Sequence, residues 1–251
     1  MNGPIYRPKG RAREYAPLAL NYYDGCSGGC LYCYTEGLWP GFSTKAPEEI
    51  GVRKGFKFEA LEEQLKTFHP GPLEYVLLSF AGDPYCPSED EHQVTRKVLE
   101  LFFEHRIPTR ILTKQGTRCL RDVPIFKRFM DAGISLTVGQ SLTFSDIKDS
   151  MKWEPGCASP DERLTALDVL HENWIPTWAS FEPVIVPAQS LDLMERGLTF
   201  IDHYAIGKLN HNKAIEDAID WKTFGQQAVE MMKKNGKSFI IKKDLVERME
   251  A

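Results

Sequence analysis

Short apolar runs alternate with segments of helical periodicity from residue 58 onward. Each apolar run is long enough for one buried strand, and each periodic segment is long enough for one helix. The expected strands are 75–80, 109–113, 134–138, 177–182, 203–207 and 238–241, and the expected helices are 59–68, 94–102, 121–131, 160–173 and 214–234. Strand and helix in strict turn indicate βαβ units and a parallel sheet.

An apolar, β-prone stretch at 18–23 adds a strand in front of this series, which gives six or seven parallel strands. We therefore predict an α/β fold of the (β/α)6 type, a partial TIM barrel with parallel strands and outer helices, with a doubly wound sheet as the alternative. Either arrangement places a site at the carboxyl ends of the strands. We expect one domain over residues 1–251, made of an N-terminal basic segment (1–16), the first strand with a cysteine loop (17–34), a long loop (35–57) and the remaining β/α units (58–251).

Composition and charge exclude several classes of protein. The 251 residues are 42% hydrophobic, which is enough to bury one full core. The sequence has no run of about 18 apolar residues and no apolar stretch behind its polar start, so we expect a cytoplasmic protein without membrane association. The net charge of −4 disfavours a dedicated nucleic-acid binder. Basic residues at 7–13 and 106–128 form either a local phosphate-binding patch or ordinary solvated faces.

Three of the six cysteines, Cys26, Cys30 and Cys33, have the spacing C-x3-C-x2-C directly after the first expected strand. Three thiolates on one loop can bind three irons of a [4Fe–4S] cluster and leave the fourth iron open. A zinc site would need a fourth Cys or His, and none follows before His69. A redox pair of Cys30 and Cys33 would leave Cys26 without a role. The scattered cysteines, which lack cluster spacing, are Cys86, Cys119 and Cys157.

Tyr32 precedes the third cysteine, so the motif resembles the C-x3-C-x-aromatic-C hallmark of the radical S-adenosylmethionine (SAM) superfamily. The resemblance implies an enzyme with a [4Fe–4S] cluster and SAM as cofactors. In that superfamily one electron from the cluster cleaves SAM, and the resulting 5′-deoxyadenosyl radical abstracts a hydrogen atom from the substrate. It further implies that Tyr32 contacts the adenine, and that an external electron donor of the flavodoxin or ferredoxin type reduces the cluster.

Several segments are similar to the spore photoproduct lyase and DNA repair photolyase branch of this superfamily. They lie at 20–26, 33–34, 83–89, 112–114 and 154–164. This resemblance makes a nucleic acid or nucleotide the first substrate hypothesis. The lyase returns a hydrogen atom from a cysteine near the end of its second strand, and residues 79–82 contain none, so we do not expect thymine-dimer repair. Cys86 is the candidate substitute, with a buried loop thiol as the alternative.

Polar residues near strand ends are the candidate SAM contacts. Lys114 ends an apolar strand, where it would pair with the SAM carboxylate or lie in solvent. Gly82 and Asp83 follow the second expected strand, where the carboxylate would meet the SAM amino group or ribose, or form an ordinary Asp-Pro turn. Glu154 and Arg163 form either a SAM-side pair or a loop-to-helix ion pair.

Four further candidates lie near the last strands. Glu182 ends an otherwise apolar strand, and we expect it to face the cavity, because burying an unpaired carboxylate is costly. Lys208 begins a polar group at 208–212 that would meet substrate or SAM, or form a surface loop. Lys242 and Lys243 would face an anion at the barrel mouth or serve as edge lysines.

Two other functions remain open from the sequence. The same radical chemistry could modify a peptide or small metabolite, although the sequence has no Cys-rich C-terminal segment of the kind often found in peptide-modifying relatives. A zinc-binding nucleic-acid module without catalysis is the alternative from another class.

Overall fold

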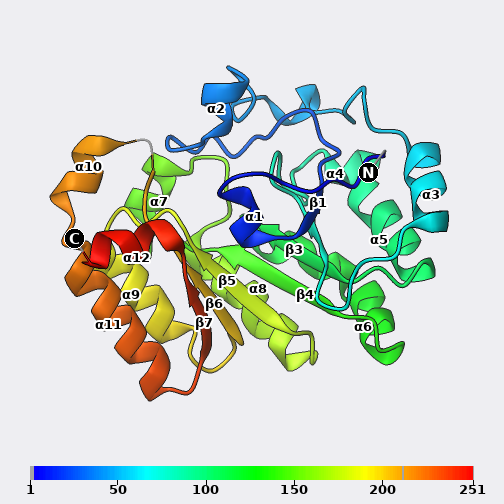
Figure 1. Ribbon diagram of the computed structural model, residues 1–251. Coiled ribbons are helices and arrows are strands. Elements are labelled where there is room, and N and C mark those ends of the chain that lie inside the picture. Colours follow the sequence, from blue (N-terminus) through cyan, green and yellow to red (C-terminus); the bar gives the residue numbers. More distant parts are fainter. Residues whose placement is uncertain (1–2, 211, 251) are drawn as a thin grey trace.

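The computed structural model describes residues 3–210 and 212–250, and these contain one seven-stranded parallel sheet (Figure 1). The strands are β1 (Leu18–Leu20), β2 (Val76–Leu78), β3 (Thr109–Thr113), β4 (Leu136–Ser141), β5 (Thr177–Phe181), β6 (His203–Ile206) and β7 (Ser238–Ile241). They lie side by side in chain order, which excludes the doubly wound alternative because its strand order reverses. The predicted α/β fold is confirmed, and the sheet is open with seven strands, the upper of the two numbers expected.

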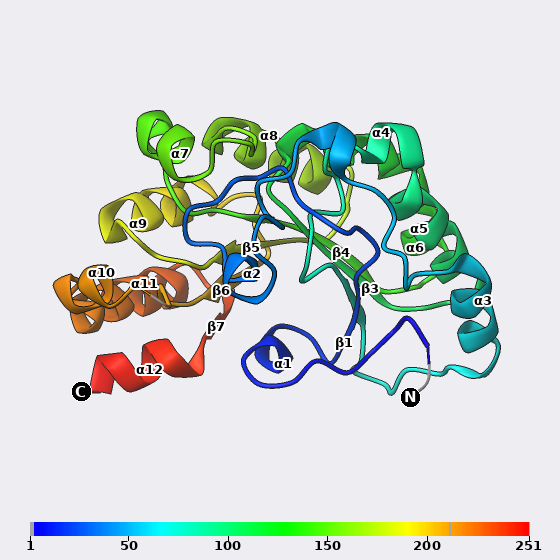
Figure 2. The same cartoon turned by 90° about the horizontal axis from the view of Figure 1, so that it is seen from above.

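Helices connect the strands, and in Figure 2 most of them form an arc along the outer side of the curved sheet, whereas two short ones, at 12–15 and 35–38, lie away from that arc. They are α1 (Ala12–Tyr15), α2 (Thr35–Leu38), α3 (Phe58–Thr67), α4 (Glu89–His92), α5 (Val94–Glu104), α6 (Val123–Asp131), α7 (Ile147–Trp153), α8 (Pro160–Glu172), α9 (Pro187–Arg196), α10 (Lys213–Ala218), α11 (Trp221–Lys234) and α12 (Lys243–Glu250). Two 3₁₀ turns, η1 (Pro47–Glu49) and η2 (Gly116–Asp122), lie in the connections. Right-handed β/α connections place such helices on one side of the sheet.

Several expected elements differ from the observed ones in their limits; among them, the strands expected at 18–23 and 75–80 end earlier, as β1 and β2. The helix expected at 214–234 is divided into α10 and α11, because Ile219 adopts extended backbone and Asp220 caps α11 by accepting a hydrogen bond from the Thr223 amide at 3.0 Å. The strand expected at 134–138 begins and ends later, as β4. The end of β4 contains a glycine and polar residues, so the run of apolar residues that predicted this strand ends before the strand itself.

Alternate residues of the strands face opposite sides of the sheet. Those facing the helices form the main core, as Leu18 and Leu20 of β1 do. Those facing the concave side include small residues such as Ala19 and Ala205, which pack with Trp178. Small side chains on this face leave room for one large side chain at the amino-terminal ends of the strands and for a cavity at their carboxyl ends.

Trp178 fills the amino-terminal end of the concave face. Its indole donates a hydrogen bond to the Ile111 carbonyl at 2.9 Å, and the Arg110 guanidinium lies 4.0 Å from the ring centroid. The indole lies against Gly139, where an added Cβ would be 2.4 Å from Nε1. A glycine is therefore required here for space.

Residues 3–16 cover the open side of the sheet between β1 and β7 (Figure 2). Tyr6 and Ala19 exchange two backbone hydrogen bonds of 3.0 and 2.9 Å, which satisfies part of the free edge of β1. At the other end of the segment, Glu14 accepts a hydrogen bond from the Lys243 amide at 3.3 Å. The N-terminal segment therefore links the first strand to the last helix.

We predict that Gly139→Ala destabilises the protein by about 1–3 kcal/mol, because the new methyl group overlaps the Trp178 indole. Urea unfolding measures the loss. Gly55→Ala is the matched control, since nothing lies within 4 Å of its added Cβ. Equal stability of the Gly139→Ala protein and its parent would contradict the proposed overlap.

Candidate functional site

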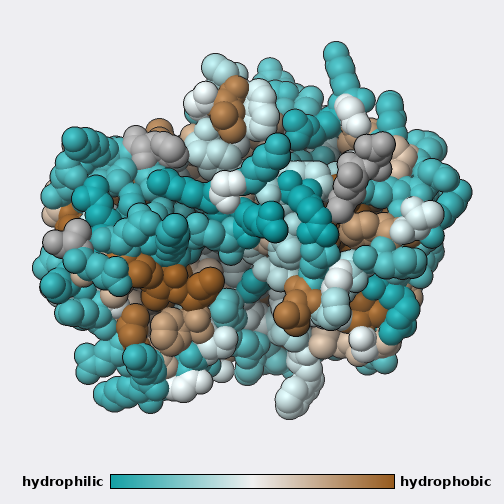
Figure 3. All heavy atoms as spheres, viewed as in Figure 1, coloured by the Kyte–Doolittle hydropathy of each residue, from teal (hydrophilic) through white to brown (hydrophobic). Residues whose placement is uncertain are grey.

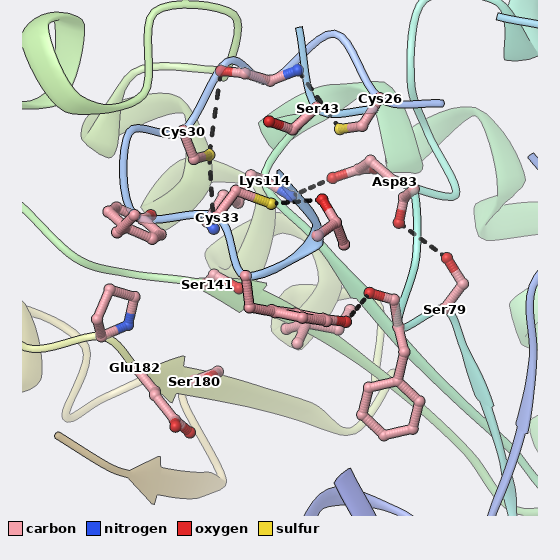
Figure 4. Close-up of a pocket in the computed structure, with 18 of the residues that line it drawn as sticks. Cys26, Cys30, Cys33, Ser43, Ser79, Asp83, Lys114, Ser141, Ser180 and Glu182 are labelled. Atoms are coloured by element: carbon pink, nitrogen blue, oxygen red, sulfur yellow. Dashed lines mark hydrogen bonds between the residues drawn. The ribbon is translucent and has the colours of Figure 1, made fainter. Parts of the chain in front are cut away.

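A cavity of about 440 Å³ opens at the carboxyl ends of the strands. Figure 4 shows three cysteines on one side of it and Ser180 and Glu182 on the other. The predicted site residues that line it are Cys26, Cys30, Cys33, Tyr32, Gly82, Asp83, Lys114, Glu182, Lys208 and Lys242. Ser141 and Ser180 are register partners on β4 and β5, so both hydroxyls reach the same wall.

The long loop that follows the cysteine loop covers it and forms backbone hydrogen bonds with it. The Cys26 amide donates to the Phe42 carbonyl at 2.8 Å, and the Gly29 amide donates to the Ser43 carbonyl at 2.8 Å. Figure 1 shows this part of the chain, around α2, lying over the sheet. The loop expected over the site is thus observed there.

Two glycines allow neighbouring loops to approach the cysteine loop. Gly82 has φ +83°, and an added Cβ would lie 3.0 Å from the Gly25 carbonyl oxygen. Gly156 lies still closer, since its added Cβ would be 1.8 Å from the Ser27 oxygen. Side chains at these positions would push the loops after β2 and α7 away from the cysteines.

Glu154 is fully buried and is contacted by three other predicted site residues. Arg163 Nη2 lies 2.7 Å from its Oε2, Lys114 Nζ lies 3.8 Å from its Oε1, and the Tyr32 hydroxyl donates to Oε1. Neither Glu154 nor Arg163 lines the cavity. Their geometry therefore favours the loop-to-helix ion pair over direct contact with a ligand.

The charges around Glu154 determine the protonation states of Glu154, Tyr32 and Lys114. Burial alone would raise the pKa of Glu154, but Arg163 and Lys114 outweigh it and lower that pKa. Burial, together with the Glu154 charge, holds the pKa of Tyr32 well above its usual range, so the phenol remains a donor. Burial opposes the charged form of Lys114, yet Cys30, Tyr32 and Glu154 raise its pKa. The lysine is a partly buried cation, not a solvent-exposed loop lysine.

Lys114 also lies beside the cysteines. Its Nζ is 3.8 Å from Cys30 Sγ and 4.9 Å from the centroid of the Tyr32 ring. A hydrogen bond to Cys157 lowers the pKa of Cys30 to about 7; the Lys114 charge acts in the same direction, and burial opposes both. Burial raises the pKa of Cys26. Cys30 is therefore readily converted to the thiolate that binds metals.

Asp83 is buried at the cavity wall, and its oxygens are occupied by protein donors. It accepts hydrogen bonds from Thr113 Oγ1 at 2.6 Å, from the Lys114 amide at 2.8 Å and from the Tyr85 amide at 2.8 Å. Burial raises its pKa. These bonds join the loop after β2 to the end of β3, so Asp83 positions the segment that carries Lys114.

The opposite wall contains a second polar cluster. Glu182 faces the cavity, as predicted, and Lys242 Nζ lies 2.9 Å from its Oε2. The Tyr15 hydroxyl donates to Glu182 Oε2 at 2.6 Å and lies 2.7 Å from Ser180 Oγ. Lys242 Nζ is 3.7 Å from the Tyr15 ring centroid. We call these four residues the distal polar wall.

Lys208 also reaches the cavity, but its ammonium group is already bonded. It contacts Glu216 at 2.6 Å, Asn210 Oδ1 at 2.8 Å and the Leu209 carbonyl at 2.8 Å. These contacts favour a role in holding the end of β6. Residue 211 of the predicted polar group lies outside the described residues.

Cys86 is fully buried in the core between the sheet and the helices and does not line the cavity. Burial raises its pKa to about 12. This position fits a buried loop thiol and disfavours a hydrogen donor to a substrate. The sequence did not point to Tyr15, Ser141 or Cys157 as cavity residues. Cys157 lies within the segment 154–164 that resembles the lyase branch, and this was the one available signal.

Basic residues of 106–128 are largely paired with acids. Arg118 lies 2.6 Å from Asp90, Arg128 lies 2.7 Å from Glu100, and Arg121 pairs with Glu89. The face drawn in Figure 3 is mostly hydrophilic with separate hydrophobic patches. These pairs favour solvated faces over a phosphate-binding patch. None of the helices within 3–210 and 212–250 has the length and apolar character needed to cross a membrane.

Comparison with known proteins supports the fold. The chain matches no protein-family model. An uncharacterized protein of Methanocaldococcus jannaschii is 31% identical over 172 residues, which are 68% of this chain and 61% of that protein. SuiB of Streptococcus suis bound to S-adenosylmethionine has a TM-score of 0.61 and 14% identity, over 87% of this chain and 48% of SuiB. A variant of spore photoproduct lyase has been solved with dinucleoside spore photoproduct. Its structure has a TM-score of 0.62 and 15% identity, over 88% of this chain and 63% of the lyase.

SuiB and spore photoproduct lyase are radical SAM enzymes. The chain therefore has the fold of these two enzymes, an open parallel α/β sheet of the partial-barrel kind. It spans about three fifths of the archaeal relative and about half of SuiB.

We predict that Glu154→Gln lowers the free energy of unfolding at pH 7 by about 3–5 kcal/mol, because it leaves the buried Arg163 without its counter-charge. The pKa of Glu154 is lowered from its ordinary value of 4.5, so its carboxylate stabilises the fold above that pH and loses this contribution as the pH falls below it. The difference in free energy of unfolding between variant and parent should accordingly be constant near neutral pH and should decrease below about pH 4.5.

Urea unfolding at a series of pH values measures this gap. Glu195→Gln removes the same charge from an exposed position and serves as the control. A Glu154→Gln gap that stays unchanged into acid would contradict the assigned ionised state.

Proposed function

We propose that this protein is a radical SAM enzyme that holds a [4Fe–4S] cluster on Cys26, Cys30 and Cys33. The observation that carries the proposal is that these cysteines line one cavity together with Tyr32 and Lys114. The donor set fits the cluster, because three thiols on one short loop can bind three irons and leave one open. Among the described residues no three His, Cys, Asp or Glu side chains already surround the position of a single metal ion.

Cys26, Cys30 and Cys33 would hold the cluster, which would supply the one-electron chemistry for reductive cleavage of SAM and hydrogen abstraction from the substrate. The protein's own residues bind and orient SAM and keep water away. Lys114 pairs with the SAM carboxylate, and the Tyr32 region contacts the adenine. Glu154, Arg163 and Asp83 position these two residues through the contacts described above.

The substrate is proposed to contact the distal polar wall, opposite the cysteines. Tyr15, Ser180, Glu182 and Lys242 offer hydroxyl, carboxylate and ammonium groups to a ligand rich in hydrogen-bonding atoms. A nucleotide or nucleic acid is the first candidate, supported by the similarity to a lyase complexed with a dinucleoside. A peptide is the alternative, because SuiB has also been solved bound to its precursor peptide SuiA. Formation of 5′-deoxyadenosine in the presence of oligonucleotides or peptides distinguishes the two.

An external electron donor of the flavodoxin or ferredoxin type is proposed to reduce the cluster. Leu31, Leu38 and Trp39 are exposed apolar side chains on or beside the cysteine loop. Apolar side chains exposed at one place are frequent at partner contacts. Loss of reduction by flavodoxin, but not by dithionite, in a Leu38→Glu protein tests this proposal.

A zinc site without catalysis remains the second candidate, because the fold brings a fourth thiol to the loop. Cys157 Sγ lies 3.7 Å from Cys30 Sγ. Two thiolates on one tetrahedral zinc, with bonds of about 2.3 Å, lie at about this separation. A colourless protein that retains zinc after anaerobic reconstitution with iron and sulfide would favour this candidate.

We predict that Cys30→Ala abolishes both the brown colour of the reconstituted protein and its cleavage of SAM, because a cluster ligand is lost. Iron and sulfide analysis and chromatography of 5′-deoxyadenosine measure the two effects. Cys119→Ala should retain both, since Cys119 is buried away from the cavity. A full complement of four irons in the Cys30→Ala protein would refute the assignment.

Lys114→Ala is expected to weaken SAM binding by roughly 1.5–3 kcal/mol, or about ten- to a hundredfold, because a charge-assisted hydrogen bond is lost. Isothermal calorimetry on the reconstituted protein measures the dissociation constant. Lys127→Ala, at an exposed position on α6, should bind as the parent does. Parental affinity in the Lys114→Ala protein would show that the SAM carboxylate binds elsewhere.

A further inference from the structure

Cys157 lines the cavity but has no role in the proposed function, and it lies against the loop of Cys26, Cys30 and Cys33. Its Sγ is 3.7 Å from Cys30 Sγ and 3.6 Å from the Gly28 carbonyl oxygen. A Cβ added to Gly28 would lie 3.2 Å from Cys157 Sγ, 3.4 Å from Cys26 Sγ and 3.6 Å from Cys30 Sγ. Three thiols therefore surround this one glycine.

The loop that carries Cys157 is fixed in this place by backbone contacts. The Gly156 amide donates to the Gly28 carbonyl at 3.0 Å, and the Leu31 amide donates to the Trp153 carbonyl at 2.9 Å. Gln115 Nε2 donates to the Gly156 carbonyl at 3.1 Å. Backbone hydrogen bonds next to Cys157 and near Cys30 therefore keep the two thiols close to each other.

The direction of the hydrogen bond between the two cysteines follows from the chemistry of the site. Either sulfur can donate in the metal-free protein. Cys30 loses its proton when it binds iron, so only Cys157 can then donate. Lys114 Nζ, 3.8 Å from Cys30 Sγ, is a second donor to the same sulfur. Cys30 is therefore the cluster ligand that receives two side-chain donors.

We infer that the Cys157 thiol donates a hydrogen bond to the Cys30 thiolate and so raises the reduction potential of the bound cluster. The inference rests on the proposed function. Hydrogen bonds to cluster sulfurs stabilise the reduced state, because they offset the negative charge that the added electron brings. Cys157 is in this sense a positioning residue that acts through Cys30.

Cys157→Ala, Cys157→Ser and the control Cys119→Ala test the inference in the reconstituted protein without SAM. All three should keep four irons per chain, because the cluster ligands are intact. At a fixed solution potential, Cys157→Ala should show about a tenfold lower ratio of reduced to oxidised cluster, which is 59 mV for one electron. Cys157→Ser retains a donor and should lie between Cys157→Ala and the parent. Redox titration followed by electron paramagnetic resonance measures the ratio.

The outcomes separate the inference from the proposed function. A Cys157→Ala protein with four irons and the parental potential would overturn the inference and leave the cluster assignment intact. Loss of iron in that variant would show that Cys157 is a metal ligand, which also overturns the hydrogen-bonding role. A parent chain that binds zinc or no metal after reconstitution would overturn the proposed function itself.

Discussion

The buried ion pair between Glu154 and Arg163 is the interaction on which the site depends. It joins the start of the loop after α7 to α8, and it orients Tyr32 and Lys114 through the same carboxylate. Charges in such a place are tolerated only when each has its partner, since an unpaired buried ion is strongly unfavourable. Removing one of these groups would therefore disturb the cysteine loop, the end of β3 and α8 together.

The alternation of apolar runs and helical segments was sufficient to predict the parallel sheet, because each β/α unit buries its own strand. The gathering of Cys26, Cys30 and Cys33 at one cavity was also predictable, since the three cysteines are local in sequence. Cys157 could not be found in this way: it is 127 residues from Cys30, and only the strand order brings the two loops together. Tyr15 was missed for the same reason, as it lies far in sequence from Ser180.

The two ends of the cavity are chemically different. At the cysteine end, the Lys114 ammonium lies 3.8 Å from Cys30 Sγ, where it would offset negative charge on that sulfur. At the distal polar wall, Glu182 and Lys242 neutralise each other, and Tyr15 and Ser180 add neutral hydroxyls. Apolar side chains such as Leu77 and Leu112 line the space between the two ends.

The segment at residues 3–16 has a consequence for how the cavity is built during synthesis. Tyr15 completes the distal polar wall only when Glu182 and Lys242 are in place, and Glu14 meets Lys243 across 229 residues of chain. Residues 3–16 are synthesised before Glu182, Lys242 and Lys243, so they can meet these partners only after the later residues have been made. Contacts between such distant parts of a chain form late in folding. The wall proposed to contact the substrate is thus finished only after β7 has joined the sheet, whereas the cysteine loop can meet its neighbours earlier.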